Sequence, residues 1–390
     1  MRQVFIFGIL TLGIWSCGEE KSAGKASGFE VELEWVDSVV VDSFYDLTLA
    51  AVDAEDGRMI FKDRSLNLIL LTDLKGEILD TLDIKGEAPN QVALPVEMIF
   101  DQGNLIVKDL EGGMPLNFFN RDFKIIQQSP PLSLGTFIIE FNLYKVSFSL
   151  FRSNGKTLLV GTEANSIEPE IRTNSWQKGE FYSHAKAGFV YDSESDSLWK
   201  FNSFPENWGH RKAGEWKGYV FPFVQALEKQ GLIGILPPVG NQFFLYQWEN
   251  QQLIPVNESL ISHPDRNDRL DYNPNDDYFL YPSFSDLKAG RQYFLIQFHT
   301  EIPVAVRDEY QAKNLNYRND PEFNEAFKKY WKYKYIIVNQ FGESFPLKDL
   351  PIQGNVHYFD KNDVLYIKPK SEVEMDYNVF YRYKVKSPES

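Results

Sequence analysis

A turn-and-strand unit recurs along this chain, and it limits the possible folds more than any other feature. Gly57–Asp63 reads GRMIFKD, and Gly103–Asp109, 46 positions later, reads GNLIVKD. In both, a glycine turn precedes an apolar strand that ends in lysine and aspartate. Counting weaker copies, the turn-plus-strand openings number six, near Gly57, Gly103, Gly155, Asn241, Arg291 and Asp363. Repeats of roughly 40–50 residues with about four strands each are typical of β-propeller blades.

The strand signals inside the first unit favour an all-β fold. Arg58–Lys62, Leu66–Leu71 and Ile78–Ile84 each read as a strand, and turn residues such as the DLKGE stretch separate them. We therefore predict a six-bladed β-propeller over residues 29–390, with loop insertions where the repeat spacing stretches. A β-sandwich followed by a second β domain is the competing interpretation.

One strand lies before the first repeat. Phe29–Val41 alternates apolar and polar residues, which is the pattern of a half-buried strand. We expect it to pair with the last C-terminal strands, because that pairing closes the ring and removes two exposed sheet edges.

One segment departs from the β pattern. In NDPEFNEAFKKYW, Asp320 is placed as an N-cap and Pro321 as the first helical residue. Phe323, Phe327 and Tyr330 then share one helical face with Trp331. The sequence predicts one short amphipathic helix inserted in a blade.

The N-terminus has the features of a lipoprotein leader. Val4–Ile14 is an apolar run far shorter than the roughly 20 residues that span a bilayer, and it has the length of a signal-peptide core. It ends in Ile14-Trp15-Ser16-Cys17, which resembles a bacterial lipobox and contains the only cysteine of the chain. We predict a signal peptide over residues 1–16 and lipidation of Cys17. A lone buried cysteine in an ordinary secreted protein is the alternative.

The segment after Cys17 predicts where the protein resides. Residues 17–28 are small and polar, as expected of a flexible tether between lipid and domain. The acidic pair Glu19-Glu20 is typical of lipoproteins that some Gram-negative lineages display on the outer face. We expect an outer membrane lipoprotein, held by its N-terminal lipid and exposed at the cell surface. The net charge of −15, without a basic aromatic patch, argues against a nucleic acid partner.

Aromatic residues outside the strand pattern mark a candidate ligand site. Aromatic side chains make up 15% of the chain, and most of them fill the spaces between strands. Several others fall in the longest gap between repeats: Trp176, Tyr182, Trp208, Trp216 and Tyr219. His210 and Arg211 lie beside them in the sequence and complete the candidate ligand-binding set. Flat aromatic rings next to polar groups suit a sugar ligand. The competing interpretation is that these loops bury their own aromatic residues against the propeller.

The sequence contains no recognisable catalytic or metal-binding motif. Its five histidines lack metal-ligand spacing, and neither a phosphate loop nor a nucleophile elbow is present, so we expect no cofactor and no metal. Asp271–Asp277 (DYNPNDD) superficially resembles a calcium loop but lacks the EF-hand register, and a solvated loop is the preferred interpretation. An enzyme would need the carboxylate pair Glu206 and Glu215, or a His or Tyr base with an Arg near Trp208–Tyr219.

The turn-strand-KD unit, followed by DLKGE and the loop Gly86–Pro95, resembles the NHL-like and TolB-like six-bladed propellers. More narrowly, the chain is similar to uncharacterised six-bladed propeller lipoproteins of Gram-negative bacteria. This resemblance implies a fold more firmly than an activity. We expect a non-enzymatic binding module for an envelope protein or a glycan. The alternative is a polysaccharide hydrolase or lyase with its site at the channel mouth.

Overall fold

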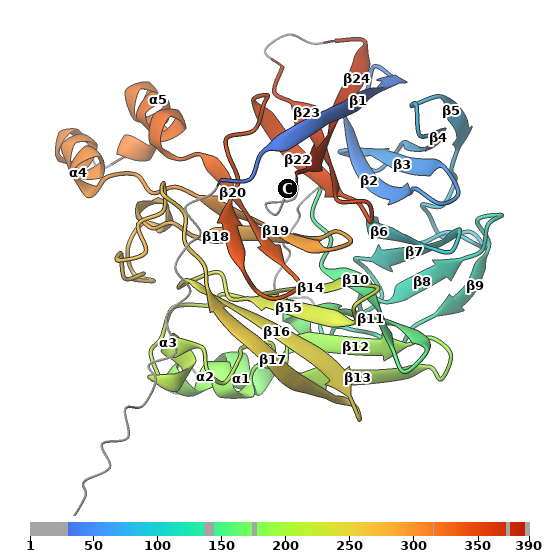
Figure 1. Ribbon diagram of the computed structural model, residues 1–390, viewed down its shortest axis with the longest axis horizontal. Coiled ribbons are helices and arrows are strands. Elements are labelled where there is room, and N and C mark those ends of the chain that lie inside the picture. The colour runs from blue at the N-terminus through green and yellow to red at the C-terminus, as the bar shows by residue number, and fades with distance from the viewer. Residues whose placement is uncertain (1–29, 136–143, 174–177, 315, 372–374, 387–390) are drawn as a thin grey trace, which may run out of the picture.

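The computed structural model describes residues 30–135, 144–173, 178–314, 316–371 and 375–386. The predicted signal peptide and tether, including Cys17, lie outside these ranges. The described strands form six four-stranded antiparallel sheets arranged in a ring (Figure 1). The prediction of a six-bladed, all-β propeller is therefore confirmed.

Blades A to E each use four consecutive strands, and blade F combines the last three strands with the first. Blade A holds β2 (Leu47–Asp53), β3 (Arg58–Asp63), β4 (Ile69–Asp73) and β5 (Ile78–Thr81). Blade B holds β6 (Pro95–Asp101), β7 (Asn104–Asp109), β8 (Leu116–Phe119) and β9 (Ile125–Gln128). Blade C holds β10 (Phe148–Ser153), β11 (Lys156–Thr162), β12 (Gly188–Asp192) and β13 (Ser197–Phe201).

The remaining blades complete the ring. Blade D holds β14 (Phe223–Leu227), β15 (Leu232–Leu236), β16 (Gln242–Glu249) and β17 (Gln252–Leu260). Blade E holds β18 (Phe284–Ala289), β19 (Tyr293–His299), β20 (Tyr333–Asn339) and β21 (Ser344–Pro346). Blade F holds β22 (Gly354–Phe359), β23 (Val364–Pro369), β24 (Tyr377–Val385) and β1 (Leu33–Asp42).

The N-terminal strand closes the ring, as predicted. Strand β1 runs antiparallel to β24, with Val39 opposite Phe380. Val39 and Val41 point into the core and are fully buried, whereas Val40 between them is 47% exposed. The alternating sequence pattern thus places one face of β1 against the propeller, and blade F joins both ends of the described chain in one sheet.

The closure strand gives a matched pair of expected results. Val39→Ala removes two buried methyl groups and should lower the free energy of unfolding by about 2 kcal/mol. Val40→Ala, one residue along on the solvent face, should change it by less than about 0.5 kcal/mol. Urea denaturation of both variants measures the difference. Equal effects would show that β1 does not contribute its inner face to the core.

The core lies between the blades. Six apolar clusters each join two neighbouring blades, so every sheet is covered on both faces. Between blades A and B, for example, Ile60 packs in one cluster with Met98 and Phe119. Burial of this kind is the main stabilising term in a fold without disulfides.

The recurring KD dipeptide has a structural role. Its lysines donate hydrogen bonds toward the next blade, Lys62 to the Val96 carbonyl and Lys108 to the Ser147 hydroxyl. Lys368 has the corresponding position in blade F, although Pro369 follows it, and donates to the Leu47 carbonyl. The neighbouring aspartate closes the following turn, since Asp63 accepts hydrogen bonds from the backbone N–H groups of Ser65 and Leu68. The repeated dipeptide therefore links blades and shapes turns.

One predicted repeat opening is out of register. Asn241 lies in the connection between β15 and β16, whereas the turn between the first two strands of blade D contains Gly231, with φ +62°. The run Leu232–Leu236 that follows Gly231 is buried throughout and shows no alternation. The turn at Gly240, before β16, resembles the other repeat openings more closely than the turn at Gly231 does, which explains why the opening was predicted at Asn241.

The predicted helix is present as α5 (Pro321–Tyr330), and the Asp320 side chain caps it by accepting a hydrogen bond from the Glu322 N–H. The sequence did not predict the other helices, which are α1 (Pro169–Thr173), α2 (Lys178–His184), α3 (Gly209–Lys212) and α4 (Val304–Lys313). Short 3-10 turns are η1 (Ala164–Ser166), η3 (Tyr278–Leu280) and η4 (Tyr317–Asn319). Within the described ranges, none of the helices has the length and apolarity needed to cross a membrane.

Candidate functional site

A cavity opens where the inner strands of blades B to E begin. Its volume is about 460 Å³, within the size range of small-molecule sites. The starts of β6, β14 and β18 line it, together with residues 145–147 just before β10 and the ends of β3, β7 and β11. A second, smaller cavity of about 80 Å³ lies among the inner strands, where β10, β14, β18 and β22 line it. We call the wider space the channel-mouth cavity.

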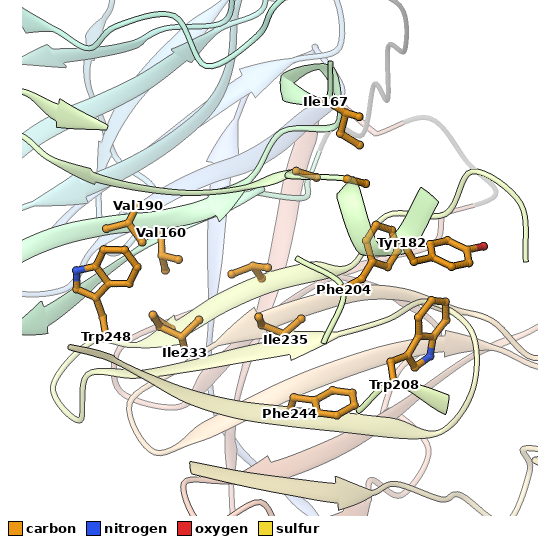
Figure 2. Packing of buried hydrophobic residues seen from close by; sticks show 14 of the residues in the cluster. Val160, Ile167, Tyr182, Val190, Phe204, Trp208, Ile233, Ile235, Phe244 and Trp248 are labelled. Carbon is orange, nitrogen blue, oxygen red and sulfur yellow. The ribbon is translucent and has the colours of Figure 1, made fainter. Parts of the chain in front are cut away.

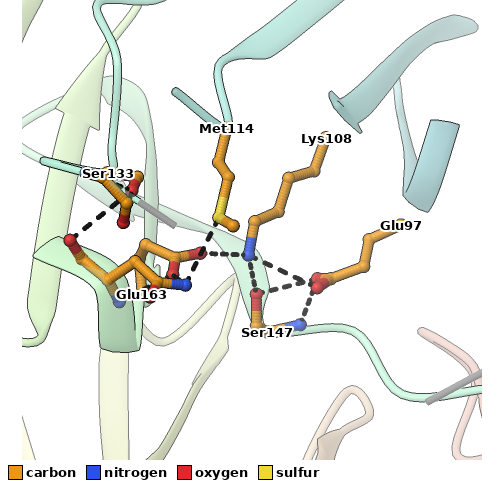
Figure 3. A network of polar contacts seen from close by, with 8 residues as sticks. Glu97, Lys108, Met114, Ser133, Ser147 and Glu163 are labelled. Carbon is orange, nitrogen blue, oxygen red and sulfur yellow. Dashed lines mark hydrogen bonds and ion pairs between the residues drawn. The ribbon is translucent and has the colours of Figure 1, made fainter. Parts of the chain in front are cut away.

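Lys108 connects the buried carboxylate of Glu163 with the partly buried carboxylate of Glu97 in this cavity (Figure 3). Its Nζ lies 2.7 Å from Glu163 Oε2 and 3.4 Å from Glu97 Oε1, and it donates to Ser147 Oγ at 3.0 Å. Burial alone would lower the pKa of Lys108, but the two carboxylates raise it above its usual range. Burial also opposes ionisation of Glu163, yet the Lys108 charge and hydrogen bonds keep the pKa of Glu163 below its ordinary value.

The local backbone fixes the position of Glu163. It follows the end of β11 and caps the 3-10 turn η1, where its carboxylate accepts a hydrogen bond from the Asn165 N–H at 2.9 Å. The Asn165 side chain donates a second bond to the same carboxylate at 3.0 Å. Glu97 accepts hydrogen bonds from both the backbone and the hydroxyl of Ser147. These fixed ion pairs make the cavity wall polar and rigid.

Lys62 lies in the same cavity but has a different environment. Its side chain comes from the end of β3, and the residue is only 2% exposed. The Val96 carbonyl accepts a hydrogen bond from its Nζ, and no carboxylate among the described residues lies within ion-pairing distance of it. Burial lowers the pKa of Lys62 to about 8, against a smaller raising effect of the Glu97 charge.

An aromatic segment forms one side of the cavity. Tyr219, Phe221 and Phe223 line it, and Tyr219 is 50% exposed. The Tyr219 ring packs edge-on against Phe181 and Trp216, at centroid distances of 5.4 and 5.0 Å. The aromatic insertion identified in the sequence therefore reaches the channel mouth through Tyr219.

Most of the aromatic residues predicted to bind a ligand do not line the channel-mouth cavity. They lie behind Tyr219, which we call the aromatic rim. Tyr182 and Trp208 are fully buried in the cluster between blades C and D (Figure 2), and Trp216 stacks on Tyr182 at 5.7 Å. The Trp208 indole N–H donates to the Val239 carbonyl at 3.2 Å. In this structure these rings support the insertion from within. Trp176 lies outside the described residues.

The predicted polar residues of the insertion do not line the channel-mouth cavity. His210 Nδ1 lies 2.8 Å from Glu215 Oε2, while Arg211 donates to the Phe204 carbonyl and lies 3.9 Å from Glu206. Glu206 and Glu215 thus have different partners. Arg211 and Glu206 line a second hollow of about 1290 Å³, bounded by β16, β17 and the turn before β21.

Among the residues that the structure describes, one group of side chains has atoms close enough to hold a metal ion. Single ligand atoms of His210, Glu215 and Asp271 lie within 4.8 Å of one another. However, the buried Lys217 ammonium lies 2.5 Å from Asp271 and 3.5 Å from Glu215, so it already supplies a positive charge there. A metal ion would have to displace it, and the donor set fits an ion-pair network better.

The acidic run that superficially resembled a calcium loop is also paired with cations. Asp271 forms the ion pair with Lys217. Arg307 lies 2.8 Å from Asp276 and 3.5 Å from Asp277. Arg318 forms a further ion pair with Asp277. These contacts tie the loop to η4 and α4 and use the carboxylates that calcium would need.

No family model and no curated protein matches this sequence, but solved structures share its fold. A member of the DUF4221 family from Bacteroides vulgatus aligns over 92% of this chain and 99% of its own, with a TM-score of 0.60 and 12% identity. A Bacteroides fragilis protein described as a candidate exported protein aligns over 93% and 98%, with a TM-score of 0.50 and 10% identity. At these identities, the similarity shows the propeller fold alone.

Proposed function

We propose that this protein is a lipid-anchored propeller of the cell envelope that binds a glycan, or a small polar ligand related to one, at the channel-mouth cavity. The observation that carries the proposal is the cavity itself, which is lined both by fixed charged groups and by the exposed aromatic ring of Tyr219. Ligand sites combine this apolar surface with a few fixed polar groups. The repeated KD unit further supports a relationship to NHL-like and TolB-like propellers.

The charges in the cavity favour binding over hydrolysis. A glycosidase general acid needs a carboxyl group that stays protonated near neutral pH. Glu163 has the opposite environment, because Lys108 lowers its pKa, and Glu97 shares the same ammonium. Fixed, ionised groups of this kind can orient sugar hydroxyls without exchanging protons.

The envelope location is proposed from Cys17 and the leader before it. The Bacteroides fragilis neighbour is described as a candidate exported protein, which agrees with this location. Cys17→Ala should release the protein from membranes or leave its precursor uncleaved, because no thiol remains for acylation. Fractionation of cells that express each form measures this. Normal processing with full membrane retention would exclude the lipobox interpretation.

The binding site can be tested with a cavity-filling variant. We expect the form that lacks residues 1–17 to retain glycans on an array. Ala164→Trp should abolish retention, because Ala164 lines the cavity and a tryptophan would occupy it. Ala213→Trp is the matched control, since Ala213 is exposed in the aromatic insertion and does not line the cavity. Retention by Ala164→Trp, or no retention by the parent form, would contradict the proposal.

A further inference from the structure

We propose that the channel-mouth cavity recognises acidic sugars, and that Lys62 receives the ligand's carboxylate. This inference rests on the proposed glycan-binding function and specifies its ligand class. It follows from three observations: the bonding of Lys62, its comparison with the corresponding residues of other blades, and the surfaces around it.

Lys62 is a buried cation with unused donor capacity. An ammonium group has three N–H donors, and the hydrogen bond to the Val96 carbonyl uses one of them. Buried charges in proteins are normally paired, because removal of an unpaired charge from water is costly. Since Lys62 lines the cavity, an anionic ligand group there can supply the missing partner.

Comparison of the blades shows which group is missing. In blade B, Glu97 lies opposite Lys108 in the pairing of β6 with β7, and the two form an ion pair. In blade A, the residue at the corresponding position opposite Lys62 is Thr48. Lys368, the corresponding lysine of blade F, forms an ion pair with Asp46. Among these three equivalent lysines, only the one in blade A faces the cavity without a carboxylate.

The remaining surfaces fit a sugar ring better than a simple carboxylate. Tyr219, Phe223 and Phe284 present apolar surface to the same cavity, on which the C–H face of a sugar can pack. The carboxylates of Glu97 and Glu163 keep acceptor capacity for hydroxyl groups. Asp286, the third carboxylate in the lining, is paired with Lys288 at 2.8 Å, so it repels an incoming anion less.

Protonation of Lys62 gives the inference a pH signature. Its pKa of about 8 in the free protein should rise when an anion binds beside it, because an opposite charge favours the ammonium form. Affinity should therefore be nearly constant between about pH 5 and 7, where the ligand carboxylate is ionised and Lys62 is protonated, and should fall by up to about tenfold per pH unit above pH 8, until the pKa of Lys62 in the complex is reached. The other charged groups that face the cavity are Lys145 and the ion-paired Glu97, Lys108, Glu163 and Asp286.

Titration calorimetry with matched sugars tests the inference. D-Galacturonate should bind the form lacking residues 1–17 at least tenfold more tightly than D-galactose, which carries an alcohol in place of the carboxylate. Lys62→Met should remove this preference. Thr48→Glu should also remove it, because it supplies the internal carboxylate that blade B has. Lys368→Met is the matched control, since it removes an equivalent inter-blade lysine outside the cavity and should keep the preference.

The outcomes separate this inference from the function on which it rests. If D-galactose and D-galacturonate bind equally and Ala164→Trp blocks both, the glycan site stands and the role of Lys62 is wrong. If Lys62→Met keeps the preference for the acid, the role of Lys62 is again overturned. If succinate binds as tightly as D-galacturonate, the ligand class is a simple carboxylate and not an acidic sugar. If the array and these titrations detect no binding, the proposed function itself fails.

Discussion

Lys108→Met should lower the free energy of unfolding by about 3–5 kcal/mol, because it leaves the buried carboxylate of Glu163 and the partly buried one of Glu97 without their cation. Lys108 is the shared partner of Glu97 and Glu163, and its side chain is only 6% exposed. Its loss also removes the hydrogen bond to Ser147 that joins blade B to blade C. Urea denaturation at pH 7 measures the change.

The effect should depend on pH in a defined direction. The folded-state pKa of Glu163 is lowered, so its contribution to stability is present above the unfolded-state pKa and is lost as the pH falls through the folded-state value. The difference between wild type and Lys108→Met should therefore shrink in acid. Adding Glu97→Gln and Glu163→Gln to Lys108→Met should restore part of the stability at pH 7, because the carboxylates left without a cation are then replaced by neutral amides.

An exposed ion pair provides the control for Lys108. Lys313 pairs with Glu309 on the surface of α4, where both side chains are more than half exposed. Lys313→Met should change the free energy of unfolding by less than about 0.5 kcal/mol. If Lys108→Met lowered the free energy of unfolding as little as Lys313→Met, the ion pairs of Lys108 would not stabilise the cavity wall as described.

Trp208→Ala should lower the free energy of unfolding by about 3–5 kcal/mol, because it leaves a large cavity in the cluster between blades C and D. Trp208 is fully buried, packs edge-on against Tyr182 at a centroid distance of 4.9 Å and has its N–H bonded to Val239. Tyr182 in turn supports Trp216, on which the Tyr219 rim rests.

The matched comparison for Trp208 is Trp199, which lies on β13 at the margin of the same cluster and is only partly buried. Trp199→Ala should cost distinctly less than Trp208→Ala in urea denaturation. Tyr219 should also become more mobile in Trp208→Ala, which hydrogen exchange of the segment 216–223 measures. Equal costs for the two tryptophans would show that Trp208 does not anchor the insertion.

Much of the fold could be predicted because the blades of a propeller repeat the same local pattern of turn residues and apolar strands. The GRMIFKD and GNLIVKD units place β3 and β7 correctly, and the alternation of residues 29–41 identifies the closing strand. Blade D was misplaced because its first hairpin, around Gly231, is uniformly apolar and carries no alternation. Helices α1 to α3 have at most seven residues, and α4 has no buried residue, so they lack the amphipathic pattern that revealed α5.

The candidate site was predicted less well, for a physical reason. Tyr182 and Trp208 share a loop-rich region with Tyr219, but only the tertiary packing decides which rings face inward. The charged residues of the cavity come from strands of different blades and meet because the sheets are arranged around one axis. The sequence repeat did not mark Lys62, because its 46-residue offset places Ala51 against Glu97, and only the strand pairing shows that Thr48 lies opposite Lys62.

A crystal structure of the form lacking residues 1–17 in complex with D-galacturonate tests the central claim most directly. The account predicts the sugar in the channel-mouth cavity, with its carboxylate within hydrogen-bonding distance of Lys62 Nζ and its ring beside Tyr219. Sugar bound instead in the hollow beside Arg211 and β17, with the channel mouth empty at saturating ligand, would contradict it.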